Sequence, residues 1–185
     1  MSKVLLDVSV SLDGFTAGPN VREAEPMGDG GEQLHTWMGE DSESDVRREL
    51  DEAVGATVIG RRTFDLGLVP WGGTPWPGIP GFVVTHQRRE DLLGDNGGTF
   101  AFDGLEAAVR RAKEAAGDRD VLVLGAEVAR QMLAAGLLDE VHIHLVPLLL
   151  GAGTPLFAGE RAELIPQGSP ASGTVTHLRY RVAKP

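Results

Sequence analysis

The feature that most constrains the fold is a strand–helix–strand pattern between residues 120 and 157. Residues 121–124 are continuously apolar, as expected for a central strand that is buried on both faces. Gly125 ends this strand, and apolar residues at helical spacing follow it as far as Gly136, which stands where a helix C-cap belongs. A second apolar strand follows at residues 141–146. This order of elements builds parallel sheets, so we predict an α/β fold.

Shorter apolar segments extend this unit on both sides. We predict strands at residues 4–12, 56–59, 81–85 and 99–102, and helices at 32–38, from 44 or 45 to 54, and at 104–116. The C-terminal segments 161–165 and 174–182 are predicted to form an antiparallel pair, the second of them with apolar residues at alternate positions.

Composition limits the classes of function. A chain of 185 residues that is 42% hydrophobic suits one domain over residues 1–185. A net charge of -10 disfavours nucleic acid as a partner, and the lack of cysteine excludes thiol catalysis. The N-terminus resembles neither a signal peptide nor a membrane span, so we expect a cytoplasmic protein without a membrane partner.

Two predicted strand ends carry residue types that bind phosphate. The strand at 56–59 runs into Gly60-Arg61-Arg62-Thr63, and the strand at 81–85 continues into His86-Gln87-Arg88-Arg89. Adjacent arginines are usually a solvated surface. Two such pairs at matching strand ends of an acidic chain nevertheless favour an anionic cofactor.

The junction at Gly125 and Ala126 is a third such position. A helix that begins directly after a central strand directs free backbone N–H groups towards the edge of the sheet, which suits a phosphate. A tight turn at Gly125 explains the same pattern without a ligand. Glu127 lies in the first helical turn, where a carboxylate suits the helix dipole by itself.

The N-terminal third contains two candidate substrate elements. Asp13 follows the first strand in a turn sequence, so it is either a turn residue or a carboxylate at the edge where α/β proteins bind ligands. Residues 21–42 are acidic and rich in glycine, and they form either a lid over a substrate or a surface insertion. Trp37 favours the lid, because a large aromatic ring in a polar loop needs a surface to pack on.

The remaining motifs argue against other enzyme classes. His142 and His144 share one strand face, but no third ligand lies nearby in the sequence, so a polar strand face explains them and no metal is expected. The chain contains no G-x-S-x-G elbow, no Walker loop and no G-x-G-x-x-G sequence.

Several short motifs follow one another in a specific order over nearly the whole chain. They are Ser11-Leu12-Asp13-Gly14-Phe15, Ile59-Gly60-Arg61, Val84-Thr85-His86, Val123-Leu124-Gly125-Ala126 and Leu150-Gly151-Ala152-Gly153. Their order and spacing resemble the dihydrofolate-reductase-like proteins, in particular the C-terminal reductase domain of the bifunctional riboflavin-biosynthesis deaminase-reductase. The resemblance implies a mixed, mostly parallel central sheet flanked by helices, with a C-terminal antiparallel strand pair.

The resemblance also implies a function. It implies NADPH as hydride donor to a small heterocyclic substrate, either a pterin or a ribosylaminopyrimidine-like molecule, in a protein that is often a homodimer. An unrelated imine or carbonyl substrate stays open, as does a non-catalytic nucleotide- or flavin-binding protein on the same fold. Family members usually have Gly-Gly where this chain has Gly125 and Ala126, and the helix-borne acid of true dihydrofolate reductases has no match here.

The residues expected at the site fall into two groups. The cofactor group comprises Gly60, Arg61, Thr63, Thr85, His86, Arg88, Gly125, Ala126 and Glu127. The substrate group comprises Asp13, Trp37, Pro147, Gly151 and Gly153. Asp13 is the candidate catalytic residue, either as an acid or as an anchor for the N–H groups of a heterocycle.

Overall fold

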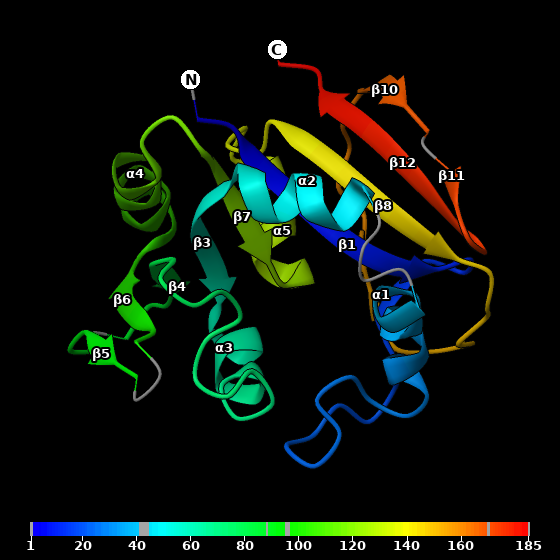
Figure 1. Cartoon of the computed structure of the whole chain (residues 1–185), viewed down its shortest axis with the longest axis horizontal. Helices are drawn as coiled ribbons and strands as arrows, with labels where there is room; N and C mark the ends of the chain where they lie inside the picture. The colour runs from blue at the N-terminus through cyan, green and yellow to red at the C-terminus, as the bar shows by residue number, and fades with distance from the viewer. Residues whose placement is uncertain (1, 41–44, 88, 95–96, 170, 185) are drawn as a thin grey trace.

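The computed structural model describes residues 2–40, 45–87, 89–94, 97–169 and 171–184 (Figure 1). The helices in this part of the chain are η1 (Gly31–His35, a 3-10 helix), α1 (Thr36–Glu40), α2 (Asp45–Ala53), α3 (Arg61–Gly67), α4 (Leu105–Ala116) and α5 (Ala126–Ala134). The strands are β1 (Val4–Ser11), β2 (Phe15–Ala17), β3 (Val54–Gly60), β4 (Gly81–Val84), β5 (Leu92–Leu93), β6 (Thr99–Asp103), β7 (Asp120–Leu124), β8 (Glu140–Val146), β9 (Thr154–Pro155), β10 (Leu164–Gly168), β11 (Ala171–Ser172) and β12 (Val175–Val182).

Most strands belong to one mixed sheet with the order β10-β12-β8-β1-β7-β3-β4-β6-β5, and β11 pairs with β12. The pairs from β8 through β6 are parallel, whereas β12, β10 and β5 join antiparallel. The predicted fold class is therefore confirmed, including the C-terminal antiparallel pair. β7 lies between β1 and β3, and Val121, Leu122 and Val123 are at most 1% exposed, as their continuous apolar run predicts.

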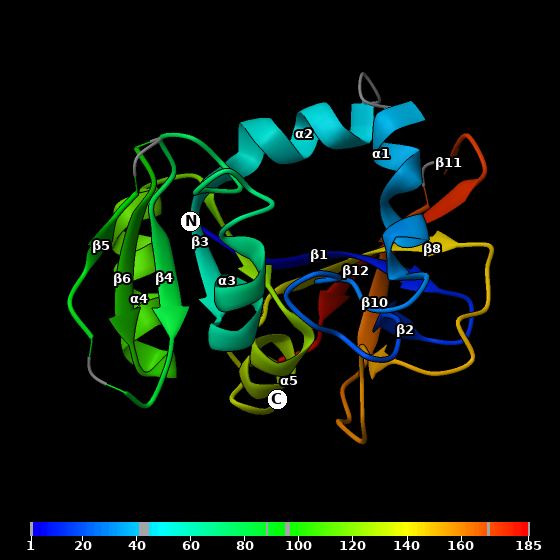
Figure 2. The ribbon, with the colours of Figure 1, turned by 90° about the horizontal axis from the view of Figure 1, so that it is seen from below.

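The two faces of the sheet are covered differently. Side chains of α4 and α5 pack on one face in a large apolar core that contains Leu6, Val58 and Val123. The other face carries a smaller apolar cluster in which Leu50 of α2 packs against Leu5, Val54 and Leu122. Figure 2 shows α2 and α5 on opposite sides of the sheet. Among the described residues, no helix combines the length and the apolar character that crossing a membrane requires.

The structure changes two details of the sequence-based expectation. The helix expected at 32–38 is divided into η1 and α1, and a small second sheet pairs β2 with β9. These two strands have only three and two residues, so they are too short to show the alternation that identifies a strand from sequence.

Candidate functional site

A cleft of about 510 Å³ lies at the edge of the sheet where β3, β4 and β7 end. Seven of the residues predicted to bind a cofactor line it, namely Gly60, Arg61, Thr63, Thr85, His86, Gly125 and Glu127. Parallel strands of an α/β sheet present their carboxyl ends at one edge, so segments far apart in the sequence converge there. Ala126 lies between two of the lining residues, and Arg88 lies outside the residues that the structure describes.

Gly125 has no side chain, so a ligand at this edge of the sheet can approach the backbone closely. Its φ angle is +109°, a conformation that favours glycine, and a Cβ atom built there would overlap Oγ1 of Thr63. Gly125 is also the N-cap of α5, and in the described part of the chain no side chain caps this helix end. The first N–H groups of α5 can therefore bind an anion in the cleft.

Arg61 supplies positive charge to the cleft from the start of α3. Its Nε atom lies 2.7 Å from Oδ2 of Asp65, one helical turn away, and the two side chains are 33% and 47% exposed. An ion pair with this exposure contributes little free energy in water, so a phosphate can compete for the guanidinium. Arg62 also lines the cleft and donates a long hydrogen bond, 3.5 Å, to the carbonyl of Val21.

Glu127 introduces negative charge that a neighbour compensates. Arg130 and Gln131 donate hydrogen bonds to its carboxylate, and the Arg130 guanidinium lowers the pKa of Glu127 below its usual range. Arg130 thus offsets part of the charge of Glu127, because the same guanidinium also lies 3.7 Å from the carboxylate of Glu160. Gly125, the uncapped N-terminus of α5 and the two arginines Arg61 and Arg62 are groups that can bind phosphate, so the residues present fit an anionic nucleotide cofactor. The volume of the cleft lies in the range of small-molecule sites.

The predicted substrate residues Asp13 and Gly151 meet elsewhere, between the turn after β1 and the loop after β8. The N–H of Gly151 donates to Oδ2 of Asp13 at 2.7 Å, and that of Leu150 donates to Oδ1 at 3.1 Å. The Ser11 hydroxyl donates to the same carboxylate at 2.6 Å and is the main cause of its lowered pKa. Through these contacts Asp13 joins the turn after β1 to the loop after β8. Its catalytic role stays a prediction.

The other predicted substrate residues also lie apart from the residues described as lining the cleft. Gly153 approaches Ala17 so closely that a Cβ atom would overlap the Ala17 carbonyl, and Pro147 is exposed just after β8. Trp37 is only 4% exposed and packs with Leu34 and Val146. Trp37 is therefore a core side chain of α1 and does not lie on the surface of a loop, and its contact with a substrate stays a prediction.

The structure contains a buried polar network that was not predicted from the sequence. Nε2 of His144 lies 2.8 Å from Oδ1 of Asp7, and Nδ1 of His144 lies 2.6 Å from Nδ1 of His177. The indole N–H of Trp37 donates to the Ser9 hydroxyl at 3.0 Å beside both imidazole rings. The sequence signal was the presence of polar residues at alternate positions of three strands, but their register was needed to join them.

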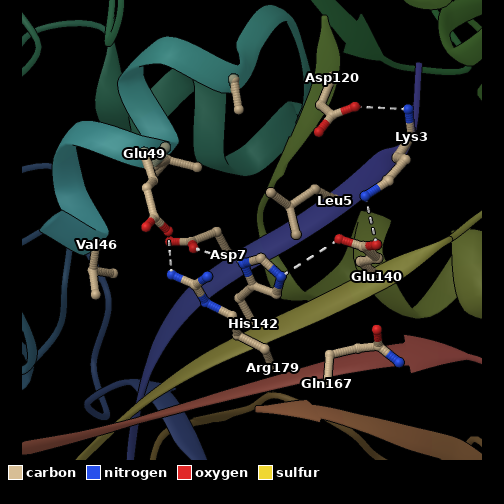
Figure 3. A pocket seen from close by; sticks show the side chains of 12 residues that line it. Lys3, Leu5, Asp7, Val46, Glu49, Asp120, Glu140, His142, Gln167 and Arg179 are labelled. Carbon is tan, nitrogen blue, oxygen red and sulfur yellow. Dashed lines mark hydrogen bonds and ion pairs between the residues drawn. The ribbon is translucent and has the colours of Figure 1, made fainter. Parts of the chain in front are cut away.

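Within the described residues, no group of three or more histidines and carboxylates has the arrangement that could hold a metal ion. A second cavity, of about 310 Å³, lies between α2 and the sheet, on the side of the Asp7 network (Figure 3). In the described part of the chain the two cavities have no lining residue in common.

Several solved structures with the same fold are described as proteins of riboflavin biosynthesis. A putative riboflavin biosynthesis protein from Shewanella sp. PV-4 superimposes with a TM-score of 0.78 at 23% identity, and the match covers 100% of both chains. The riboflavin biosynthesis reductase of Saccharomyces cerevisiae matches with a TM-score of 0.60 at 14% identity, over 98% of this chain and 90% of that chain.

Two curated proteins are similar in sequence over most of this chain. The uncharacterized protein YwjB of Bacillus subtilis is 26% identical over 185 residues, which cover 96% of this chain and 97% of the relative. The uncharacterized protein YyaP of the same organism is also 26% identical, over 84% of this chain and 80% of the relative. The family model for the RibD C-terminal domain matches residues 2–178. The chain therefore belongs to the RibD C-terminal domain family.

Proposed function

We propose that the chain is an NADPH-dependent reductase that transfers a hydride to a small heterocyclic substrate, a pterin or a ribosylaminopyrimidine-like molecule. The observation that carries the proposal is the convergence of Gly60, Arg61, Thr63, Thr85 and Gly125 in one cleft at the carboxyl edge of the sheet. Membership of a family with reductase members supports it.

Each part of the cleft has a task in this proposal. The bare backbone at Gly125 and the first N–H groups of α5 would bind the pyrophosphate, because an uncapped helix end favours an anion. Arg61 and the segment from Thr85 to Arg88 would bind the adenosine side with its 2′-phosphate. NADPH supplies the hydride when it is bound, and the protein holds the reacting groups together and excludes water.

The substrate also needs a polar partner in the protein. Asp13, the candidate from the sequence, has a lowered pKa, so its carboxylate is ionised at neutral pH. An ionised carboxylate suits an anchor for the N–H groups of a heterocycle better than a proton donor. We therefore propose that any contact of Asp13 with substrate is one of orientation.

The decisive experiment is a calorimetric titration of the full chain with NADPH and NADH, repeated with Arg61→Ala. A charge-assisted hydrogen bond to the 2′-phosphate contributes about 1.5–3 kcal/mol, so NADPH is expected to bind about ten- to a hundredfold more tightly than NADH. Arg61→Ala should remove most of this preference.

Arg110→Ala is the matched control, because Arg110 forms the same type of exposed i,i+4 ion pair, with Glu114 at 3.1 Å. Equal affinity of the wild-type protein for the two cofactors would contradict the proposal. If Arg61→Ala weakens both cofactors equally, Arg61 contacts the pyrophosphate that they share.

A non-catalytic nucleotide- or flavin-binding protein is the second candidate. Two observations favour it: Ala126 replaces the usual second glycine, and the carboxylate of Asp13 is engaged by loop N–H groups. A panel of pterins, aminopyrimidines, imines and carbonyls, followed by the loss of NADPH absorbance, separates the two. Binding of NADPH without oxidation by any of them would favour the non-catalytic protein. Light scattering in the same buffer tests the homodimer that we also propose.

A further inference from the structure

The cavity beneath α2 lies between this helix and a polar part of the sheet, and it is partly open to solvent. Figure 3 shows Asp7 of β1, Glu140 and His142 of β8 and Arg179 of β12 around it, with Val46 and Glu49 projecting from α2. Neighbouring strands bring these residues together, because Asp7 is in register with His142, and His142 with Arg179.

Such a lining is unusual beneath a helix. A helix that covers a sheet normally packs apolar side chains against apolar side chains and leaves no space. Here the apolar part of the lining consists of Leu5, Val46, Leu50 and Ala53, while charged residues make up most of the rest. Charged groups in a partly covered cavity cost free energy unless they have partners, so a polar cavity of this volume is suited to a ligand or to ordered water.

The lining contains more carboxylates than lysine and arginine side chains. Lys3 pairs with Glu140 at 2.9 Å, and Arg179 pairs with Glu49 at 2.6 Å. The carboxylates of Asp7 and Asp120 remain beyond these two pairs. Asp120 accepts a backbone N–H from Lys3, and Asp7, whose side chain is only 8% exposed, faces His142 at 3.6 Å and His144 at 2.8 Å. Excess negative charge in a partly enclosed space attracts cations and repels phosphate esters.

We propose that this cavity is a binding site for a small organic cation that carries an amidinium, guanidinium or primary ammonium group. The cationic group lies beside Asp7, between Glu49 and Glu140, and its hydrocarbon part packs on Leu5 and Leu50. The site goes beyond the proposed reductase activity, because its lining is separate from that of the cofactor cleft in the described part of the chain.

The test is calorimetry of the full chain with benzamidine and with benzoate, which have nearly the same size and opposite charge. No cofactor is present, so the result is independent of NADPH binding. We expect benzamidine to bind with one site per chain and at least about tenfold more tightly than benzoate, as for one charge-assisted contact. Asp7→Asn and Glu49→Gln should each weaken benzamidine binding about tenfold or more.

Asp118→Asn is the matched control, because it removes the same charge from an exposed turn near Asp120 that does not belong to the lining. If Asp7→Asn fails to fold, the test rests on Glu49→Gln. This variant should fold, because Glu49 lies on the surface of α2 with 56% of its side chain exposed. Three results would overturn the proposal: no benzamidine binding, equal binding of benzoate, or an equal effect of Asp118→Asn. A parallel NADPH titration reports on the cofactor cleft alone.

Discussion

Nε2 of His144 lies 2.8 Å from Oδ1 of Asp7, although the two residues are 137 positions apart in the chain. The carboxylate can only accept, so this imidazole nitrogen carries a proton. The 2.6 Å contact between Nδ1 of His144 and Nδ1 of His177 then requires one donor and one acceptor. A single polar chain thus joins β1, β8 and β12 beneath Trp37.

Asp7 should make the protein sensitive to acid. Burial by itself raises the pKa of Asp7, but the hydrogen bonds from His142 and His144 outweigh it and lower the pKa from 3.8 to about 2. A group whose pKa is lower in the folded state stabilises the protein above its unfolded pKa, and this stability is lost as the pH falls towards 2. The shift corresponds to about 2 kcal/mol.

The measurement is urea unfolding of the wild-type protein and of Asp7→Asn at several values of pH between 6 and 2. The wild-type protein should lose about 2 kcal/mol more than the variant over this range. Asp118→Asn, which changes an exposed carboxylate, should follow the wild-type curve. Parallel curves for the wild-type protein and Asp7→Asn would show that Asp7 has no part in acid unfolding.

The hydrogen bond from Trp37 to Ser9 should contribute to stability because both side chains are buried. The indole N–H donates to the hydroxyl at 3.0 Å, and the residues are 4% and 2% exposed. Ser9→Ala leaves a buried donor without its acceptor, which costs about 1–3 kcal/mol. In a Trp37→Phe background the donor is absent, so the same change should cost less. Thermal unfolding of the four proteins gives the coupling energy, and additive effects would count against the bond.

The contrast between the two cavities shows what the sequence could reveal. The cofactor cleft was predictable because Gly60, Thr85 and Gly125 stand at the ends of apolar strands, and the ends of parallel strands meet at one edge. The cavity beneath α2 and the Asp7 network depend on the register between β1, β8 and β12, which the sequence does not reveal. The hydrogen bonds of Asp13 could not be predicted either, because they join a turn to a loop that is 138 positions away in the sequence.

Gly125→Ala should disturb the cofactor cleft in particular. The added methyl group meets Oγ1 of Thr63, and the φ angle of +109° is unfavourable for alanine, at a cost of about 1–3 kcal/mol. Gly136→Ala is the control, because its φ is +69° and no described atom lies within 4 Å of the added methyl group. Both variants should lose stability, but only Gly125→Ala should also weaken NADPH in calorimetry. Equal cofactor affinity in the two variants would place the pyrophosphate away from Gly125.

Asp13→Asn separates a role in joining loops from a role in the reaction. The amide keeps one oxygen for the Ser11 hydroxyl and the N–H of Leu150, but its NH₂ group cannot accept the N–H of Gly151. We therefore expect faster amide hydrogen exchange at Gly151, with NADPH affinity unchanged because Asp13 does not belong to the described lining of the cofactor cleft.

Turnover of an active substrate by the same variant completes the test. If Asp13 only joins the loops, turnover should fall less than about tenfold, because one of the two loop N–H bonds to this side chain, that from Leu150, remains. A general acid or base contributes roughly 10²–10⁴-fold to a rate. A loss of that size, with exchange at Gly151 as slow as in the wild-type protein, would assign Asp13 to the reaction. The geometry leads us to expect the opposite pattern, fast exchange with most of the turnover retained.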